Sequence, residues 1–177
     1  MYKIILAGFG GQGVLSMGQL MAYSAMKADK EVSWMPAYGP EMRGGTANCS
    51  VIISDEAVAA PIISHPNILT AFNKPSLVKF SEKVEKDGFI FVNSSLIDIK
   101  VERKDVKTYY IPANELAIKC GTIKAANVIM LGVINKVCNI LTHELVYEGL
   151  KYSFKAKPHL VDVNIKTYHF GYDFLKA

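Results

Sequence analysis

The chain has 177 residues, of which 50% are hydrophobic and 20% are charged, and this is enough apolar material for one domain with a buried core. Its net charge is only +4 and its lysines are scattered, so the composition argues against nucleic-acid binding. No apolar run reaches the roughly eighteen residues that a transmembrane helix needs, and no membrane partner is expected.

The N-terminal segment combines a short apolar run with a cluster of glycines. Residues 3–7 (KIILA) are typical of a buried parallel strand. The glycines that follow interrupt the apolar stretch that a signal peptide would need, and no small-residue cleavage site comes after it, so we expect a cytoplasmic protein. Residues 12–27 then carry apolar side chains at a spacing that predicts a helix packed on the sheet.

The rest of the chain continues to alternate strands with helices. Strands are expected at residues 31–35, 46–53, 68–72, 89–93 and 106–112. Helices are expected at residues 75–86, 113–119 and 124–138, after Thr142, and from Pro158 onward. This order predicts an α/β fold: a single three-layer, doubly wound domain over residues 1–177, with a mostly parallel sheet flanked by helices on both faces. Residues 46–53 follow the second strand through a loop at 36–45 without a helix, so the parallel pattern could break there.

A glycine-rich loop at residues 8–13 (GFGGQG) matches the pattern G-x-G-x-x-G, directly after a predicted strand and directly before a predicted helix. Glycines allow a tight turn and a close approach of the backbone to a ligand. The N-terminus of the following helix offers unpaired N–H groups and a partial positive charge, which suit a phosphate or a carboxylate.

Three interpretations of this loop remain open: tight packing of strand on helix, contact with an anion or a cofactor other than NAD, and a dinucleotide site. A dinucleotide site requires an acidic residue at the end of the second strand, where this chain has Trp34, Met35 and Pro36. Asp29 and Glu31 lie at the opposite end of that strand. The lysine of a P-loop is also missing, which disfavours nucleotide hydrolysis.

A second glycine-rich loop follows the second strand and is expected at the same edge of the sheet. Arg43, between glycines, has the space to bind a carboxylate or a phosphate with two hydrogen bonds. The apolar residues around it offer a surface that a partner could cover, although an ordinary exposed loop is the alternative. The loop comprises Tyr38, Gly39, Pro40, Glu41, Met42, Arg43, Gly44, Gly45 and Thr46.

Neither loop contains a catalytic set of side chains. Cys49, Cys120 and Cys138 are far apart and form no C-x-x-C motif, so we expect reduced thiols rather than disulfides, a zinc site or an iron–sulfur cluster. The four histidines show no metal-ligand spacing, and no metal site is expected. A ligand-binding edge without catalytic groups indicates one part of a larger active site.

The two loops in this order resemble the gamma subunits of 2-oxoacid:ferredoxin oxidoreductases. The resemblance rests on GFGGQGV and YGPEMRGGTANCSVIIS, and it continues through NSS at 93–95, IPANELA at 111–117 and AANVIMLG at 125–132. It therefore covers most of the chain. The beta subunit of indolepyruvate oxidoreductase shares this domain. Among the branches, the plain separate form of the chain is most similar to 2-oxoglutarate:ferredoxin oxidoreductase, while pyruvate and branched 2-oxoacids stay open.

The resemblance implies a non-catalytic subunit within a complex that converts a 2-oxoacid and coenzyme A to acyl-CoA and CO2 while reducing ferredoxin. Thiamine diphosphate, Mg and iron–sulfur clusters are then expected on alpha, beta and ferredoxin-like delta partners. This chain would contact coenzyme A at most. Arg43 is the implied anion contact, and the other residues of 38–46 are implied to lie at the interface or on the coenzyme A path. The implied ligand-facing turn consists of Gly8, Gly10, Gly11, Gln12 and Gly13.

Two other functions compete with this one. A free-standing NAD(P)-dependent oxidoreductase would need ribose recognition, which the sequence does not show. A scaffold module would bind no ligand at either loop. An isolated chain could also form a homodimer, because a subunit taken from its complex exposes apolar surface.

Overall fold

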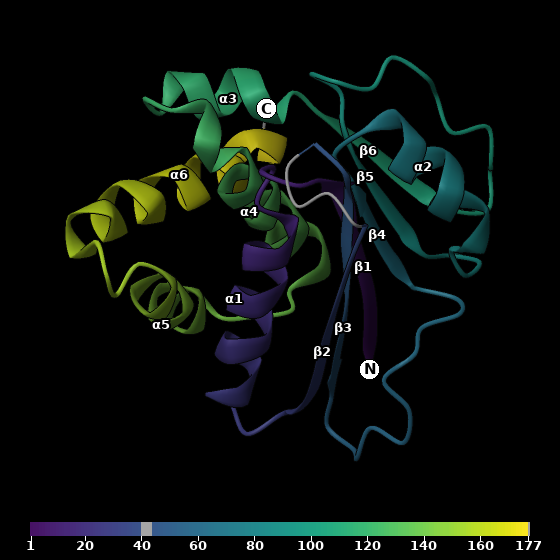
Figure 1. The fold of residues 1–177 in the computed structure, drawn as a ribbon, viewed down its shortest axis with the longest axis horizontal. Coiled ribbons are helices and arrows are strands. Elements are labelled where there is room, and N and C mark those ends of the chain that lie inside the picture. The colour runs from purple at the N-terminus through teal and green to yellow at the C-terminus, as the bar shows by residue number, and fades with distance from the viewer. Residues whose placement is uncertain (40–43, 177) are drawn as a thin grey trace.

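The computed structural model describes residues 1–39 and 44–176, and places one sheet between two helical layers of unequal size (Figure 1). The strands of this part of the chain are β1 (Tyr2–Phe9), β2 (Glu31–Tyr38), β3 (Thr46–Ser54), β4 (Ile68–Ala71), β5 (Phe89–Asn93) and β6 (Lys107–Ile111). The helices are α1 (Val14–Met26), α2 (Lys74–Phe80), α3 (Ala113–Lys119), α4 (Ala126–Cys138), α5 (His143–Ser153) and α6 (Val161–Asp173). Short 3-10 turns cover Ser81–Lys83, Ile123–Ala125, Pro158–Leu160 and Phe174–Lys176.

The strands lie in the order β2-β3-β1-β4-β5-β6. β1, β4, β5 and β6 run parallel to one another, while β3 is antiparallel to both β1 and β2. The α/β fold with a mostly parallel sheet is therefore confirmed, and the pattern breaks at residues 46–53. The connection between β2 and β3 is short. A short connection can join only antiparallel neighbours, whereas a parallel crossover needs a longer connection, usually a helix.

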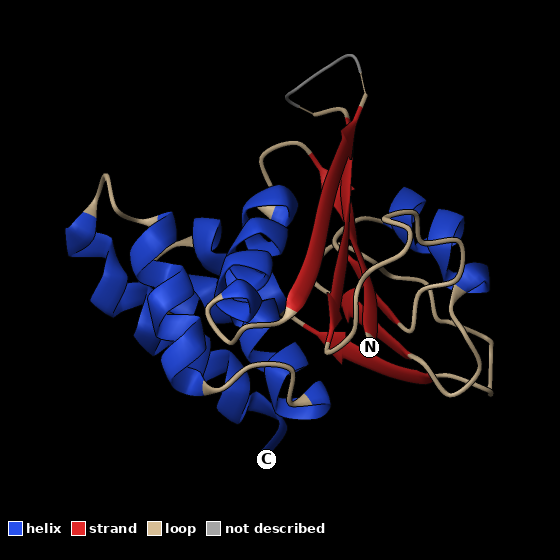
Figure 2. Ribbon diagram, turned by 90° about the horizontal axis from the view of Figure 1, so that it is seen from below, coloured by secondary structure: helices blue, strands red, loops and turns tan. Residues whose placement is uncertain are grey.

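Alternate residues of β1 enter two separate apolar cores. Ile4 and Leu6 belong to the core beneath α1, α4, α5 and α6, and Ile5 and Ala7 belong to the smaller core beneath α2. Figure 2 shows the helix-rich layer on one face of the sheet and α2 with its adjoining loops on the other. Burial on both faces explains why β1 reads as a continuous apolar run rather than as an alternating one.

Three element boundaries differ clearly from the sequence-based prediction. β1 extends to Phe9, so Gly8 and Phe9 lie in the strand rather than in the loop. β2 continues to Tyr38, although Pro36 was expected to open a loop. β2 lies at the edge of the sheet, where a residue without an N–H group is tolerated. The helix expected at 75–86 ends at Phe80 and continues only as a 3-10 turn. By contrast, the predicted cap at Thr142 is confirmed, since its side chain accepts a hydrogen bond from the Leu145 N–H.

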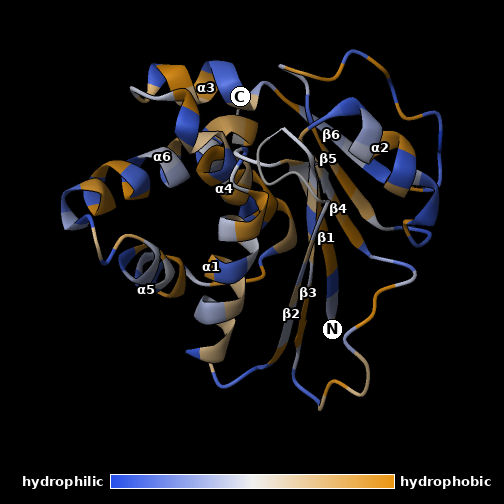
Figure 3. Cartoon of the chain, in the orientation of Figure 1, coloured by the Kyte–Doolittle hydropathy of each residue, from blue (hydrophilic) through white to orange (hydrophobic). Residues whose placement is uncertain are grey.

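α4 and α6 cross with almost no space between their backbones. A Cβ atom added to Gly132 of α4 would lie 2.2 Å from the carbonyl oxygen of Tyr168, and one added to Gly171 of α6 would lie 2.1 Å from that of Ile129. Figure 3 shows α4 as a largely hydrophobic helix between α6, α1 and the sheet. Glycine at both positions thus allows the two helices to approach closely. None of the described helices has the length and hydrophobicity that a membrane span requires.

Candidate functional site

The glycine-rich loop lies where the connections of the sheet change direction. It follows β1, whose chain continues through α1 toward β2, while the neighbouring β4 continues through α2 toward β5. In open α/β sheets ligands bind in the crevice outside the carboxyl ends of the strands at such a switch point. The fold therefore places the predicted loop at the position where a ligand site is expected.

Gln12 closes this loop across the switch point. Its Oε1 accepts a hydrogen bond of 2.6 Å from the Phe9 N–H, and its Nε2 donates one of 3.2 Å to the carbonyl oxygen of Phe72, just after β4. A Cβ atom on Gly8 would come within 2.6 Å of the same Oε1. The side chain of Gln12 thus joins the two strand ends, and Gly8 leaves room for it.

Gly11 and Gly13 give the loop its turn. Both have positive φ angles, +100° and +76°, which side chains rarely adopt. A Cβ on Gly13 would lie 2.5 Å from Nδ2 of Asn127, which donates a hydrogen bond of 3.2 Å to the Gly13 carbonyl oxygen. A Cβ on Gly11 would meet nothing within 4 Å. Packing therefore explains Gly8 and Gly13, whereas Gly11 serves the backbone turn and faces open space.

The N-terminus of α1 carries no counter-charge of its own. Gly13 occupies the N-cap position without a side-chain hydrogen bond, and the first turn of α1 contains no acidic residue. The unpaired N–H groups and the helix dipole therefore produce a positive potential at this end. An anionic group would be stabilised there.

The second glycine-rich loop contacts the first through its described residues. The Gly10 N–H donates to the Gly45 carbonyl oxygen at 2.9 Å, and the Gly44 N–H lies 3.5 Å from the Gly10 carbonyl oxygen. Gly39 and Thr46 close the base of the loop, with the Gly39 N–H donating at 2.9 Å. The two predicted loops thus share one edge. Pro40, Glu41, Met42 and Arg43 lie outside the described residues, and the anion contact of Arg43 stays a prediction.

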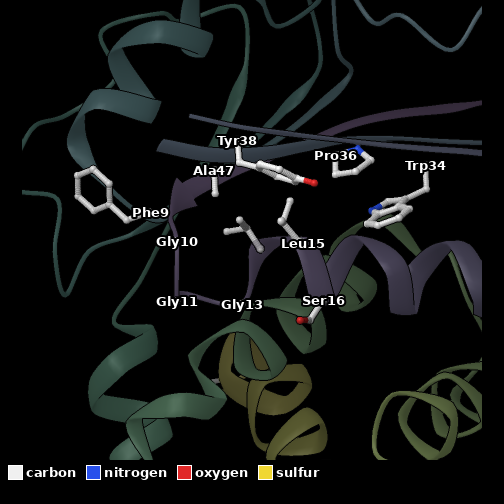
Figure 4. A pocket seen from close by; sticks show the side chains of 11 residues that line it. Phe9, Gly10, Gly11, Gly13, Leu15, Ser16, Trp34, Pro36, Tyr38 and Ala47 are labelled. Carbon is white, nitrogen blue, oxygen red and sulfur yellow. The ribbon is translucent and has the colours of Figure 1, made fainter. Parts of the chain in front are cut away.

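A cavity of about 490 Å³ opens between the glycine-rich loop, the first turn of α1 and β2 (Figure 4). Trp34, Pro36 and Tyr38 line one wall in a row along β2, and Leu15 of α1 lies opposite them. The sequence predicts Tyr38 in a loop, whereas it lies in β2, and it predicts no site role for Trp34, Pro36 or Leu15. The alternating positions of the three β2 residues were the signal for a shared face.

Side chains that could act as nucleophiles or metal ligands do not gather at this cavity. The Cys49 thiol lies beneath it, 3.5 Å from the Val14 carbonyl oxygen, and its burial raises its pKa from 9.0 to about 12. Because the thiolate is the reactive form, this sulfur is a poor nucleophile at neutral pH. No group of three or more His, Cys, Asp or Glu residues that could hold a metal occurs in the described part of the chain.

Comparison with known proteins identifies the family. The family described as "Pyruvate ferredoxin/flavodoxin oxidoreductase" matches residues 3–174. The chain belongs to this family. Both glycine-rich loops, the cavity and the described strands, apart from the first residue of β1, fall within the matched region.

Relatives within the family differ in length. The ketoisovalerate oxidoreductase subunit VorA of Methanothermobacter marburgensis is 38% identical over 98% of this chain, but this chain spans only 36% of VorA. The 2-oxoglutarate synthase subunit KorC of Methanocaldococcus jannaschii is 31% identical over 98% of this chain and 94% of KorC. The chain is thus similar to about a third of VorA and to nearly all of KorC.

A solved structure of the family has the same fold. The gamma subunit of a keto/oxoacid ferredoxin oxidoreductase from Geobacter sulfurreducens superposes with a TM-score of 0.84 at 26% identity, and the match covers 100% of both chains. The sheet and the two helical layers described above are therefore those of a gamma subunit of this family.

Proposed function

We propose that this chain is the gamma component of a multi-subunit 2-oxoacid:ferredoxin oxidoreductase and carries no catalytic side chains itself. The complex would convert a 2-oxoacid and coenzyme A to acyl-CoA and CO2, and the electrons released would reduce ferredoxin. The observation that carries this proposal is the pair of joined glycine-rich loops beside an open cavity whose described lining includes no His, Cys, Asp, Glu or Lys side chain. Such an edge can bind and position a ligand, but the chemistry must come from elsewhere.

Coenzyme A suits the cavity in both its polar and its apolar parts. The unpaired N–H groups at the start of α1 favour a phosphate, and the wall formed by Trp34, Pro36 and Tyr38 can cover an apolar or aromatic group. Arg43 and the rest of the loop at 38–46 would extend this contact toward the partner subunits. Contact with coenzyme A at this edge is thus the direct role that we propose for the chain.

Thiamine diphosphate, Mg and iron–sulfur clusters are assigned to partner subunits of the alpha, beta and delta type. An iron–sulfur cluster requires several thiolates close together. Burial raises the pKa values of both Cys49 and Cys138 to about 12, which disfavours thiolates at these positions. The described residues also bring together no group of three or more His, Cys, Asp or Glu side chains, so we propose that the electrons pass through partner subunits to ferredoxin.

Two observations point to different 2-oxoacids. KorC, whose name specifies 2-oxoglutarate, is 31% identical to this chain, whereas VorA, whose name specifies ketoisovalerate, is 38% identical. We favour 2-oxoglutarate as the first substrate to test, because several of the relatives are KorC proteins. Pyruvate and branched 2-oxoacids are the alternatives that a substrate panel must include.

The first test is an anaerobic affinity purification of the tagged protein from its native cells, with an untagged extract as the control. The purified material is then assayed with coenzyme A, a viologen acceptor and a panel of 2-oxoacids. Co-purification of larger chains with 2-oxoacid-dependent viologen reduction supports the proposal, and the panel names the substrate. If the protein elutes alone and inactive, the subunit proposal fails, and dinucleotide titration becomes the test of the NAD(P) alternative.

A pair of glycine variants separates a coenzyme A contact from a scaffold role. In the assembled complex, Gly11→Ala strains the turn and adds a methyl group beside the cavity, so the KM for coenzyme A should rise while that for the 2-oxoacid is unchanged. Gly121→Ala introduces a similar strain, at φ +103°, outside both loops and serves as the control. Equal effects of the two variants, together with full activity of Arg43→Ala, would favour a scaffold.

A further inference from the structure

The loop between β3 and β4 exposes a run of apolar residues. Residues 57–63 (AVAAPII) are all apolar, and five of them are exposed: Ala57, Ala59, Ala60, Pro61 and Ile62. Ile62 is 72% exposed, which is the largest exposed fraction among the large hydrophobic side chains of the described residues. A folded chain rarely leaves so many consecutive apolar residues in water unless they have a function.

The two ends of this loop are held in place. The Glu56 N–H donates a hydrogen bond of 3.0 Å to the Ser54 hydroxyl at the end of β3. At the other end, the Asn67 Oδ1 accepts a hydrogen bond of 2.8 Å from the Lys3 N–H of β1. Between these ends, Ile63 packs against the core beneath α2. The loop therefore lies on the side of the sheet opposite α1 (Figure 1), and its exposed side chains project from an anchored base.

The backbone of residues 57–65 is unpaired as well. No N–H or carbonyl group of these residues forms a hydrogen bond with a described residue. Backbone groups that become buried need hydrogen-bond partners, so a surface that covers this loop must offer donors and acceptors in addition to apolar area. Another protein surface offers both, whereas the hydrocarbon core of a bilayer offers neither donors nor acceptors.

The charges around the apolar run favour a second copy of this chain as the occupant. Residues 57–64 contain no charged side chain, so two copies of the run can meet without like-charge repulsion. Glu56 precedes the run and His65 follows it, and both side chains are exposed. The neighbouring acid, Asp55, is already paired with Lys30. If two loops meet in antiparallel directions about a two-fold axis, Glu56 of each copy lies beside His65 of the other.

We propose that residues 56–65 form a self-complementary surface through which two copies of this chain associate about a two-fold axis. Val58 and Ile62 supply apolar contact, and Glu56 and His65 supply the polar contacts at the ends. Stable interfaces engage about 20–30 residues on each partner, and this loop has fewer, so the association is reversible and depends on concentration. The aromatic cavity lies on the other side of the sheet and stays uncovered in such a dimer.

The test is analytical ultracentrifugation of the full chain alone over a range of protein concentrations. A reversible equilibrium between monomer and dimer is expected for the unmodified protein. Ile62→Glu should raise the dissociation constant of the dimer by about tenfold or more, because each dimer would then cover two carboxylates. The matched control is Ile118→Glu on α3, where the isoleucine is 59% exposed, and this variant should dimerise normally.

An exchange of charges tests the two-fold arrangement itself. Glu56→Lys places a lysine beside His65 of the second copy, and His65→Glu places two acids side by side, so each single variant should associate about twofold to fivefold more weakly. The double variant Glu56→Lys/His65→Glu restores a pair of opposite charges at both ends of the interface. It should therefore associate better than either single variant.

Several results would overturn the proposal. These are a monomer at every concentration, equal weakening by Ile62→Glu and Ile118→Glu, and a double variant that associates no better than the single ones. Protection of residues 57–63 from hydrogen exchange in the affinity-purified complex, but not in the chain alone at high concentration, would assign the loop to a partner subunit instead. Because the protein is studied alone in the first three measurements, their failure leaves the affinity purification unaffected.

Discussion

Gly132 offers a direct test of how α4 is held. A Cβ added there would lie 2.2 Å from the carbonyl oxygen of Tyr168 and 2.6 Å from the backbone nitrogen of Tyr172. Both atoms belong to the backbone of α6, so rotation of a side chain cannot relieve the contact. Gly132→Ala must therefore move the two helices apart, and α4 also carries the Asn127 side chain that holds Gly13.

The expected loss follows from two opposing effects. Overpacking a well-packed core costs about 1–3 kcal/mol, and a backbone clash of this kind belongs at the upper end, about 3 kcal/mol. Alanine gains about 1 kcal/mol over glycine in helix propensity. The net destabilisation is then about 2 kcal/mol, which lowers the Tm of a chain of this length by about 4–8 °C.

Guanidinium unfolding followed by circular dichroism measures this difference. The matched control is Gly149→Ala on α5, whose added Cβ would lie 2.2 Å from the Ser24 hydroxyl oxygen and 3.0 Å from the Leu20 side chain. Those side chains can rotate away, so the control should lose less stability. A Gly132→Ala protein as stable as the unmodified one, or no less stable than Gly149→Ala, would refute the close crossing of α4 and α6.

Two further predictions concern the thiols of Cys49 and Cys138 and the side chain of Gln12. Burial raises the pKa values of the Cys49 and Cys138 thiols from 9.0 to about 12, so their contribution to stability is complete below pH 9 and is lost as the pH rises from 9 toward 12. The double variant Cys49→Ala/Cys138→Ala should show a shallower loss of urea-unfolding free energy in this window, and an equally steep loss would contradict the assignment. Gln12→Glu keeps an acceptor for the Phe9 N–H but places a carboxylate oxygen against the Phe72 carbonyl oxygen, which should cost about 1–3 kcal/mol in thermal unfolding. Unchanged stability would show that Gln12 does not bridge the two strand ends.

The sequence was sufficient for features that depend on local pattern. β5 and α3 have the predicted bounds, because apolar runs, turns and helix ends are set by neighbouring residues. Both glycine-rich loops were found for the same reason. The sequence predicts that β2 ends at residue 35, because a proline usually ends a strand, and only the order of the strands shows that Pro36 lies at an edge.

Contacts between distant residues could not be predicted in this way. The hydrogen bond from Gln12 to Phe72 spans 60 residues, and that from Asn127 to Gly13 spans 114. Asn114 in α3 and Lys124 after it line one cavity of about 220 Å³ together with Gly11. Only the packing of these segments beside the glycine-rich loop brings the three residues together. A single sequence contains no signal that pairs such positions.

Pro36 also hinders the addition of another strand to the sheet at its β2 edge. The Gly39 N–H donates to the Thr46 carbonyl oxygen on β3. In an antiparallel pair every second residue directs its N–H toward the partner strand, so the odd-numbered residues of β2 face β3. The N–H groups of Val32, Trp34 and Tyr38 face outward, away from the sheet. Pro36 falls within this outward row and supplies no N–H group. An added strand would meet a gap in the middle of its ladder, so β2 is a poor template for edge-to-edge aggregation. Association of this chain with other proteins at the β2 edge is thereby directed away from strand addition and toward contacts between side chains.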